Sequence, residues 1–390
     1  MPSALDGVII ADFSRVLAGP YATMLMADLG ATVIKVERPG SGDDTRGWGP
    51  PFAADGQATY FQSVNRSKLS IALDLTDADD LEVAQRLAKA SDVLIENYRP
   101  GALARFGLDY PAVAAVNPGV VYCSISGFGS GAGRDLPGYD LLVQAMGGLM
   151  SITGTDQPTK VGVALVDVLT GLHATVGILA ALRHRDVTGV GQSLEVSLIQ
   201  SLQSSLVNQM SSVLGAGVIP GFMGNAHPSI SPYEVFSASD RPLILAVGND
   251  AQFARLMAAL GRPEMAVDPA FAANADRVTH RSELVRVLND LLAERTADEW
   301  QRIITEAGVP CGPINDIATG LELSESLGLS PVVTIEDPRR ESAQRHVANP
   351  VNYSATPAIY RSAPPEVDED RDEVLALIAE RDSRVGEESR

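Results

Sequence analysis

One acidic residue occupies a position from which a carboxylate could act as a nucleophile. Asp167 follows the apolar run 161–166 and precedes a segment with helical spacing of apolar residues. An aspartate at a helix start is most often an N-cap, which contributes about 1 kcal/mol. The partial positive charge of a helix start also favours the ionised carboxylate, and an ionised carboxylate can attack a thioester carbonyl carbon. The pattern alone favours the cap, and the two roles compete for the same oxygen atoms.

Basic residues follow several predicted strands in the first part of the chain. They are Arg15, Lys35, Arg38, Arg46, Arg66, Lys68, Arg99 and Arg105. Because ligands of open α/β sheets bind beyond the carboxyl ends of the strands, several of these side chains are expected to meet on one rim. The chain has 30 Lys and Arg against 49 Asp and Glu, a formal net charge of -19. A local positive cluster therefore indicates a phosphorylated ligand, although for any single residue a solvated surface position is an equally good explanation.

A glycine-rich segment, Gly127–Gly133, follows another predicted strand. Backbone N–H groups in such a loop can bind phosphate, but the dinucleotide-binding fingerprint requires its glycines directly after the first strand. The first turn, 14–19, contains a single glycine. A mobile surface loop is the favoured interpretation, and a nicotinamide-dependent dehydrogenase is not supported. Ser126 and Ser130 lack a visible histidine partner, so a serine hydrolase is not supported either.

The composition argues against several other classes. The five histidines are scattered and the two cysteines, Cys123 and Cys311, lie in apolar surroundings, which predicts buried free thiols and no metal site. A uniformly acidic chain repels nucleic acid and anionic membranes, so we expect neither as a partner. No apolar run reaches about 18 residues, and the N-terminus lacks a basic segment followed by an apolar one. We therefore expect a cytoplasmic protein without a membrane span.

Alternating strand and helix patterns must position these residues. Short aliphatic runs typical of strands buried on both faces alternate with segments whose apolar residues recur at helical spacing. The predicted strands are 8–13, 32–36, 70–73, 92–96, 120–126 and 194–196, and the predicted helices are 19–30, 77–90, 140–150, 168–185 and 198–214. With short connections, this pattern predicts an α/β fold with an open, mostly parallel, Rossmann-like sheet.

The sequence also divides into two predicted domains. Residues 1–214, completed by about 330–390, form the larger one, residues 215–232 are a Gly- and Pro-rich linker, and residues 233–329 form a smaller, mainly helical α/β domain. The smaller domain is expected to contain a strand at 243–247 and helices at 250–260, 281–294 and 297–307. Residues 332–359 are expected to be extended, 372–380 to form a short helix, and the final ten residues to fray.

Short motifs along nearly the whole chain resemble one known family. They are Asp12–Pro20 (DFSRVLAGP), Val33–Asp43 (VIKVERPGSGD), Thr45–Trp48 (TRGW), Asn65–Lys68 (NRSK), Glu96–Gly101 (ENYRPG), Gly138–Asp140 (GYD), Thr188–Gln192 (TGVGQ) and Gly308–Pro313 (GVPCGP). Together, though not singly, these motifs are highly specific. They are similar to those of the family III CoA-transferases, the group of formyl-CoA transferase and carnitine CoA-transferase.

The resemblance implies an enzyme that moves CoA from an acyl-CoA thioester to a free carboxylic acid, with CoA as co-substrate and no metal. It implies a covalent intermediate on Asp167 and an interlocked, ring-like homodimer whose larger domain binds CoA. The CoA-contacting residues of the family correspond to Val16, Leu17, Ala18, Arg38, Lys68, Asn97, Tyr98 and Arg105. The expected substrate pocket contains Arg15, Trp48, Tyr60, Tyr139, Asp140 and His227. Arg15, Arg46 and His227 are the candidates for contact with a second carboxylate, which favours dicarboxylic acids.

Two departures from related enzymes narrow the expected reaction. The α-methylacyl-CoA racemases resemble this chain but have a histidine where Tyr139 stands. Proton removal and return at an α-carbon needs two bases, and tyrosine, with an ordinary pKa near about 10, is a poor base at neutral pH. Leu17 stands where formyl-CoA transferase has glutamine, and residues 215–231 contain no run of consecutive glycines, so we expect an acceptor other than oxalate. A racemase and a non-catalytic acyl-CoA-binding protein remain the alternatives.

Overall fold

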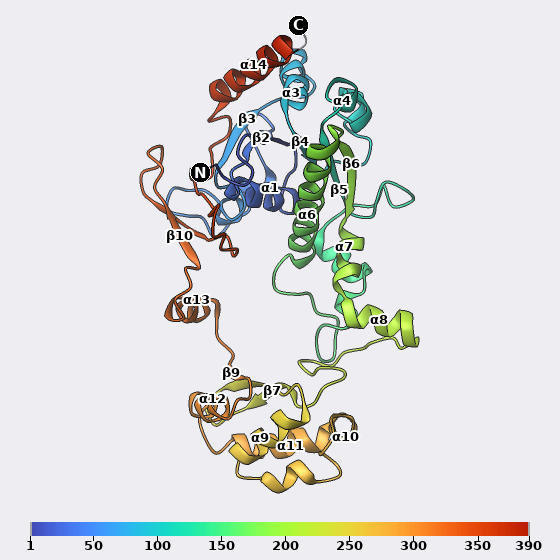
Figure 1. The fold of residues 1–390 in the computed structure, drawn as a ribbon, viewed down its shortest axis with the longest axis vertical. Helices are drawn as coiled ribbons and strands as arrows, with labels where there is room; N and C mark the ends of the chain where they lie inside the picture. The colour runs from blue at the N-terminus through green and yellow to red at the C-terminus, as the bar shows by residue number, and fades with distance from the viewer. Residues whose placement is uncertain (1, 389–390) are drawn as a thin grey trace. The chain divides into compact units, whose positions relative to one another are not determined.

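The computed structural model describes residues 2–388, which form two compact units (Figure 1). The first unit contains Met1–Leu149, Val161–Gly217 and Ser330–Arg390, and the second contains Met150–Lys160 and Val218–Leu329. Residues 150–160, which the sequence analysis assigns to the larger domain, thus group with the second unit. The C-terminal segment returns to the first unit, so neither unit is one continuous stretch of chain.

A six-stranded sheet forms the centre of the first unit, with strand order β3-β2-β1-β4-β5-β6. All neighbouring strands are parallel, which confirms the predicted α/β fold. The strands are β1 (Ile9–Asp12), β2 (Thr32–Glu37), β3 (Lys68–Ala72), β4 (Val93–Glu96), β5 (Val121–Ser126) and β6 (Gln192–Ser197). The order reverses between β1 and β4, and in sheets of this kind the crevice for ligands opens beyond the carboxyl ends at this point.

Helices cover both faces of this sheet, which explains why its strands are nearly uniformly apolar. One core lies between the sheet and α1 (Ala18–Asp28) and α6 (Leu165–Thr188). A second core lies on the opposite face, against α3 (Ala78–Ala90), α4 (Tyr110–Val116) and α14 (Arg371–Glu388). The inner strands are therefore rigid, and the side chains that follow them start from well-fixed positions.

Helix α6 begins earlier than the sequence pattern indicates. It starts at Leu165 with Ala164 as N-cap, so the expectation that Asp167 is itself the N-cap is wrong: Asp167 lies within the first turn. In the described part of the chain, α6 is the one helix long and apolar enough to cross a membrane, judged by length and composition alone. Its buried residues pack on the sheet core, which accounts for that composition.

Other differences concern element ends. The predicted helix 198–214 is two helices, α7 (Leu198–Ser205) and α8 (Val207–Ala216), because Val207 adopts a positive φ of 32°. The terminal helix α14 extends to Glu388 rather than fraying after residue 380, since Val374 and Ile378 anchor it in the core. The extended segment after residue 331 contains an antiparallel pair, β10 (Val332–Ile335) and β11 (Gln344–Val347). The other short elements of this unit are α2 (Thr59–Gln62) and α5 (Asp140–Met146), with 3-10 turns at Asp44–Gly47, Ala104–Phe106 and Leu149–Ser151.

The second unit combines a small antiparallel sheet with a helical layer. Its strands are β7 (Tyr233–Ser237), β8 (Pro242–Ala246) and β9 (Cys311–Pro313), in the order β7-β8-β9. Its helices are α9 (Asp250–Ala259), α10 (Asn274–Thr279), α11 (Arg281–Leu292), α12 (Ala297–Glu306) and α13 (Ile317–Ser326), with a 3-10 turn at Pro263–Val267. The unit has a core of its own, which includes Phe236, Phe253 and Trp300. The sequence analysis predicted β8, α9, α11 and α12 but not the flanking strands.

Candidate active site

The loop after β1 is tied to the end of β4 at the point where the strand order reverses. The backbone N–H of Arg15 donates to Oδ1 of Asn97 at 2.9 Å, and Nδ2 of Asn97 donates to the carbonyl oxygen of Arg15 at 2.8 Å. Asn97 follows β4 directly, and its side-chain amide bonds both backbone polar groups of Arg15, as a neighbouring strand would. This reciprocal pair holds the loop in one position beside the crevice.

Val16, the next residue, has a strained backbone. Its φ is 69°, in the left-handed region that β-branched residues rarely adopt, and such strain costs about 1–3 kcal/mol. The conformation persists because its N–H donates to both carboxylate oxygens of Asp43, at 3.3 and 3.2 Å. Asn97 on one side and Asp43 on the other thus fix the chain just before α1.

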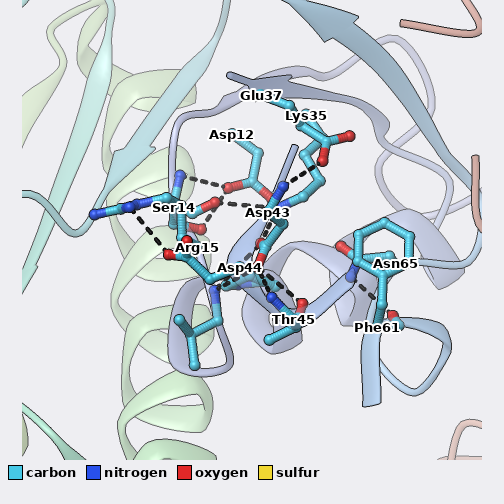
Figure 2. A network of polar contacts seen from close by, with 12 residues as sticks. Asp12, Ser14, Arg15, Lys35, Glu37, Asp43, Asp44, Thr45, Phe61 and Asn65 are labelled. Carbon is cyan, nitrogen blue, oxygen red and sulfur yellow. Dashed lines mark hydrogen bonds and ion pairs between the residues drawn. The ribbon is translucent and has the colours of Figure 1, made fainter. Parts of the chain in front are cut away.

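Asp43 belongs to a buried network of charged groups beneath this loop (Figure 2). Nζ of Lys35 lies 2.7 Å from Oδ2 of Asp43 and also donates to the carbonyl oxygen of Ser14 at 3.1 Å. Burial alone would raise the pKa of Asp43, but the charge of Lys35 and hydrogen bonds from Lys35 and Thr45 lower it to about 2. Asp43 is therefore ionised at neutral pH, and its charge is compensated inside the protein.

Lys68, an expected CoA contact, is part of the same interior and not of the rim. Its side chain has no exposed surface and pairs with Asp12 at 3.1 Å. Nζ also donates to the carbonyl oxygen of Pro20 and to Oδ1 of Asn65, both at 3.0 Å. Burial lowers the pKa of Lys68 to about 8, although the charge of Asp12 opposes this. The expectation that Lys68 faces a ligand from the rim is corrected, because all of its hydrogen bonds point into the core.

An open cavity of about 250 Å³ lies against the carboxyl ends of β1, β4 and β5 and the start of α6. It brings together predicted residues that are far apart in sequence. Those on its wall are Arg15, Val16, Leu17, Ala18, Asn97, Tyr98, Tyr139 and Asp167. The wall thus combines five of the eight expected CoA contacts, two of the expected substrate residues and the expected nucleophile.

Asp167 is half-buried on this wall, in the first turn of α6. The helix start is capped from another element: Oδ1 of Asp140 accepts the backbone N–H of Val166 at 2.8 Å and that of Asp167 at 3.3 Å. Among residues 2–388, no group donates a hydrogen bond to the carboxylate of Asp167 itself. The competition between cap and nucleophile is therefore resolved, since Asp140 takes the capping role and leaves the Asp167 oxygens free.

The electrostatic environment of Asp167 differs from the one expected. Burial raises its pKa, and the negative charge of Asp140 raises it further, to about 7. The expectation that the helix start keeps this carboxylate fully ionised is corrected, because burial and a like charge outweigh the positive end of α6. At neutral pH the carboxylate and carboxylic acid forms are both populated.

Tyr60 and Trp48 lie near this site without lining the cavity. Their rings meet edge to face with centroids 5.2 Å apart, and Trp48 is 42% exposed. Burial raises the pKa of Tyr60 to about 12, with the charges of Asp167, Asp140 and Asp43 contributing in that order. The phenol is therefore within electrostatic range of the Asp167 carboxylate and stays protonated.

Four other predicted residues are not on the cavity wall. Arg38 forms an exposed ion pair with Asp44, which does line the cavity. Arg105 is exposed and its guanidinium lies 4.5 Å from the ring centroid of Phe106. His227 belongs to the second unit, where its ring packs against Tyr233 with centroids 5.3 Å apart. Asp140 caps α6 and is likewise not part of the wall.

The glycine-rich loop is a feature whose role the sequence analysis missed. Gly127, Gly129, Gly133 and Gly138 all line the cavity, together with Arg99 and Arg134. A Cβ on Gly138 would lie 2.6 Å from Cα of Gly127, so the two backbones cross too closely for side chains. The loop is at the surface at residues 130–132, as predicted, but three of its glycines also line the cavity. The glycine spacing in the sequence could have indicated this role. Glycine is needed where the backbones of Gly127 and Gly138 cross, and not for phosphate binding.

The same loop is fastened to the edge strand β6. Both carboxylate oxygens of Glu195 accept hydrogen bonds from Ser130, at 2.6 Å from the backbone N–H and 2.8 Å from the hydroxyl. Glu195 therefore holds the loop in place. In the described part of the chain, no group of three or more His, Cys, Asp or Glu side chains is arranged to hold a metal ion.

Comparison with known proteins adds a family to this geometry. The family described as CoA-transferase family III matches residues 5–371. A succinate–glutarate CoA-transferase of Agrobacterium fabrum is 41% identical over 384 residues, covering 96% of this chain and 95% of its own. An acetyl-CoA:oxalate CoA-transferase of Acetobacter aceti is 40% identical over 325 residues, covering 82% and 83%. The crystal structure of a CAIB/BAIF family protein from Brucella suis is 38% identical, with a TM-score of 0.86, covering 97% of this chain and 100% of its own.

Proposed function

We propose, on the premise that this chain belongs to CoA-transferase family III, that it transfers CoA from an acyl-CoA to a free carboxylic acid through a covalent intermediate on Asp167. The family assignment itself supports an enzyme that exchanges CoA between acids. The covalent route is our proposal for how this chain performs the exchange.

The observation that carries the proposal is the state of the Asp167 carboxylate. It lies on the wall of the cavity and, among residues 2–388, accepts no hydrogen bond. Its neighbour Asp140 holds the N–H groups that would otherwise occupy these oxygens. A half-buried carboxylate without hydrogen-bond donors is poorly stabilised as an anion, and such an anion is a competent nucleophile once it is formed.

The proposed reaction conserves an activated acyl bond in every step. One oxygen of Asp167 attacks the thioester carbon, the C–S bond breaks, and CoA leaves as a thiolate. The thiolate then attacks the aspartyl carbon of the resulting anhydride and releases the donor acid as a carboxylate. The acceptor carboxylate attacks the aspartyl thioester and expels CoA again. The thiolate finally attacks the acceptor acyl carbon, which restores the carboxylate of Asp167.

We propose that the acceptor is a dicarboxylic acid. The two relatives described above are named for succinate and glutarate and for oxalate, all of which carry two carboxylates. The cavity wall supports this choice because it contains Arg15, Arg99 and Arg134, and guanidinium groups bind carboxylates with two parallel hydrogen bonds. Leu17 on the same wall supports succinate or glutarate over oxalate.

The active form is proposed to be a homodimer, interlocked as the family resemblance implies. Helix α6, which carries Asp167, leaves an apolar stripe uncovered within its own unit: Leu172 is 41% and Val176 is 67% exposed. These residues are one helical turn apart and lie on the same face. A second copy of the chain is the proposed cover. Light scattering at working concentration should give twice the chain mass of 41.1 kDa; a monomer mass would contradict the proposal.

The function is tested by incubating the enzyme with an acyl-CoA and a panel of free acids, with mass spectrometry of the CoA products. Succinyl-CoA with glutarate is the first pair, and hydroxylamine added during turnover should trap the aspartyl thioester as a hydroxamate on Asp167. Formation of acyl-CoA products without any adduct would exclude the covalent route but not CoA transfer. A protein that binds acyl-CoA but forms neither product nor adduct would be the non-catalytic alternative.

The racemase alternative gives a different signal. A racemase exchanges the α-proton of a 2-methylacyl-CoA with deuterated water in the absence of an acceptor acid, and a transferase does not. We expect no exchange, because Tyr139 stands where the second base is needed and is 63% exposed on the cavity wall. Deuterium incorporation at the α-carbon that depends on Asp167 would favour the racemase.

The pH profile of transfer provides a separate prediction about Asp140. Transfer should increase with pH through about 7, because only ionised Asp167 attacks and its pKa is raised to about 7 by burial and by Asp140. Asp140→Asn removes the negative charge but keeps an oxygen that can accept the two N–H groups. The midpoint of the profile should therefore move to lower pH. Initial rates between pH 5 and 9 at saturating substrates measure it.

Two variants separate charge from position in this experiment. Asp140→Ala loses the cap as well as the charge, so we expect the transfer rate at pH 8 to decrease about tenfold or more as Asp167 is displaced. Asp186→Asn removes an exposed carboxylate at the opposite end of α6 and should leave the midpoint where it is. An unchanged midpoint in Asp140→Asn would show that burial alone sets the pKa of Asp167.

A further inference from the structure

Arg15 is one of three arginines on the cavity wall, with Arg99 and Arg134, and of the three it alone is only partly exposed. Lys35 and Lys68 are fully buried and paired with aspartates, and Arg46 is paired with Glu37. Arg15 lines the cavity, and among residues 2–388 its side chain donates one hydrogen bond, from Nη1 to Oδ2 of Asp44 at 3.1 Å. Its Nε is shielded from solvent and has no hydrogen-bond partner. An arginine has five N–H donors, so most of those on Arg15 remain available.

The local charge around Arg15 is positive. Its counter-ion, Asp44, is shared with Arg38, so two guanidinium groups face one carboxylate. In a chain with a formal net charge of -19, an excess cation at a cavity wall favours an anionic group of the ligand. The other acidic residue on this wall is Asp167. In the proposed reaction Asp167 attacks an acyl carbon, so it does not serve as the counter-ion of Arg15.

The position of the guanidinium is set before a ligand arrives. The backbone of Arg15 is clamped by Asn97 through two hydrogen bonds, and the guanidinium carbon lies 5.4 Å from the ring centroid of Tyr98. A planar group held in this way loses little entropy when it binds a carboxylate, which is the reason arginine suits such sites. The Arg15 side chain is thus already positioned to form an ion pair with a ligand carboxylate.

Arg15 and Asp167 belong to elements that lie against each other. A Cβ on Gly171 would be 2.7 Å from the carbonyl oxygen of Ala18, so the start of α1 touches α6 one helical turn after Asp167. Three residues of chain, at most about 10 Å, separate Ala18 from Arg15. The two side chains therefore come from adjacent elements, and both line the same cavity of about 250 Å³.

We infer that Arg15 is the specificity-determining residue that binds the distal carboxylate of a dicarboxylic acceptor while its other carboxylate reacts at Asp167. The inference rests on the proposed function, because it assigns one end of the acceptor to a site beside the nucleophile. The ligand that Arg15 would bind is a short, unbranched acid with a second carboxylate, such as succinate or glutarate.

A competition assay tests this without interference from the donor half of the reaction. Glutarate and valerate, which have the same chain length and differ in the distal carboxylate, are supplied together at equal concentration with one acyl-CoA. The ratio of glutaryl-CoA to valeryl-CoA, measured by mass spectrometry at early times, equals the ratio of their kcat/KM values. The wild type should favour glutarate, and Arg15→Gln should reduce the ratio by about tenfold or more, the loss of one charge-assisted pair.

Two control variants make the result specific. Arg15→Lys keeps the charge but loses the planar fork, so its ratio should be intermediate; it also serves if Arg15→Gln fails to fold. Arg86→Gln removes an arginine of α3 that pairs with Asp382 and is not on the cavity wall, and should leave the ratio as in the wild type. Thermal unfolding of each variant establishes that it is folded.

Two outcomes would overturn the inference while the proposed function stands. A ratio of glutaryl-CoA to valeryl-CoA that is the same in the wild type and in the Arg15 variants would show that Arg15 does not recognise the distal carboxylate. An increase in the KM for acyl-CoA in Arg15→Gln, by the same factor with either acid, would assign Arg15 to the CoA phosphates. Failure of the wild type to transfer CoA to any acid would contradict the proposed function itself.

Discussion

Asp167→Asn is expected to abolish CoA transfer while making the folded protein more stable at pH 8. The variant keeps the volume of the side chain but removes the nucleophile, so the rate should decrease by at least about a thousandfold. The acyl-CoA should still bind, because the other residues of the cavity wall are unchanged. Steady-state transfer assays and equilibrium binding of acyl-CoA measure the two effects separately.

The gain in stability follows from the sign of the pKa shift. Burial and Asp140 raise the folded-state pKa of Asp167 to about 7 from the ordinary 3.8, so the folded state holds this proton more tightly than the unfolded state. Wild-type stability therefore falls as pH rises from about 4 to 7, and the variant, which cannot ionise, avoids this loss. We expect a gain on the order of 2 kcal/mol in the free energy of unfolding at pH 8, reduced by partial exposure of the group.

The pH dependence provides the control for this first prediction. At pH 5 the difference between variant and wild type should be smaller than at pH 8, and it should vanish below about pH 4, where the group is protonated in both states. Urea unfolding at the two pH values measures the difference. Near wild-type turnover would eliminate the covalent scheme, and a loss of stability at pH 8 would mean that the ionised carboxylate has a partner in the folded state.

Asp43→Ala should destabilise the first unit by about 3–5 kcal/mol. The same substitution at the neighbouring Asp44 should have a much smaller effect. Removing the Asp43 carboxylate leaves Lys35 charged, fully buried and without its partner at 2.7 Å. It also removes the acceptor of the Val16 N–H, which holds that residue in its strained conformation. Chemical denaturation at pH 7 measures the loss.

The matched control is Asp44→Ala. Asp44 forms ion pairs with Arg15 and Arg38, whose side chains are 34% and 52% exposed. Surface pairs of this kind contribute about 1 kcal/mol or less. The effect of Asp43→Ala should also depend on pH. Because the pKa of Asp43 is lowered to about 2, the contribution of this carboxylate to the free energy of unfolding is fully present above about pH 4 and is lost as pH falls towards 2. Equal destabilisation by the two substitutions would mean that the buried network does not hold the loop.

The predictability of the fold came from local patterns. The aliphatic runs of β1, β2, β4 and β5 and the helical spacing of α1 and α3 are properties of short windows, and alternation of the two implies a parallel sheet. These segments are recognisable because a strand buried on both faces must be apolar along its whole length. Boundaries were less accurate, as at α6 and α14, since tertiary contacts extend a helix beyond its own periodic pattern.

The candidate site was predictable in part for the same reason. Basic residues after strands were expected to meet at one edge, and of these Arg15 and Arg99 do line one cavity with Asp167. Asn97 and Tyr98, which also line it, were expected from the family resemblance. Asp167 was recognisable by its place at the start of a helix. The glycine-rich loop was misjudged because its glycines serve a crossing of two backbone segments, Gly127 against Gly138, which no short window of sequence contains.

The sequence by itself determined the succession of strands and helices along the chain and indicated an aspartate at a helix start as a candidate nucleophile. Both depend on residues close together in the chain. Only the tertiary structure decided how that aspartate behaves. Its pKa depends on burial and on Asp140, which is brought to it from another helix. Likewise, Lys68 looks like a surface cation in sequence but is neutralised by Asp12 in the core. Charge state is set by desolvation and by groups across space, and both exist only once the chain has folded.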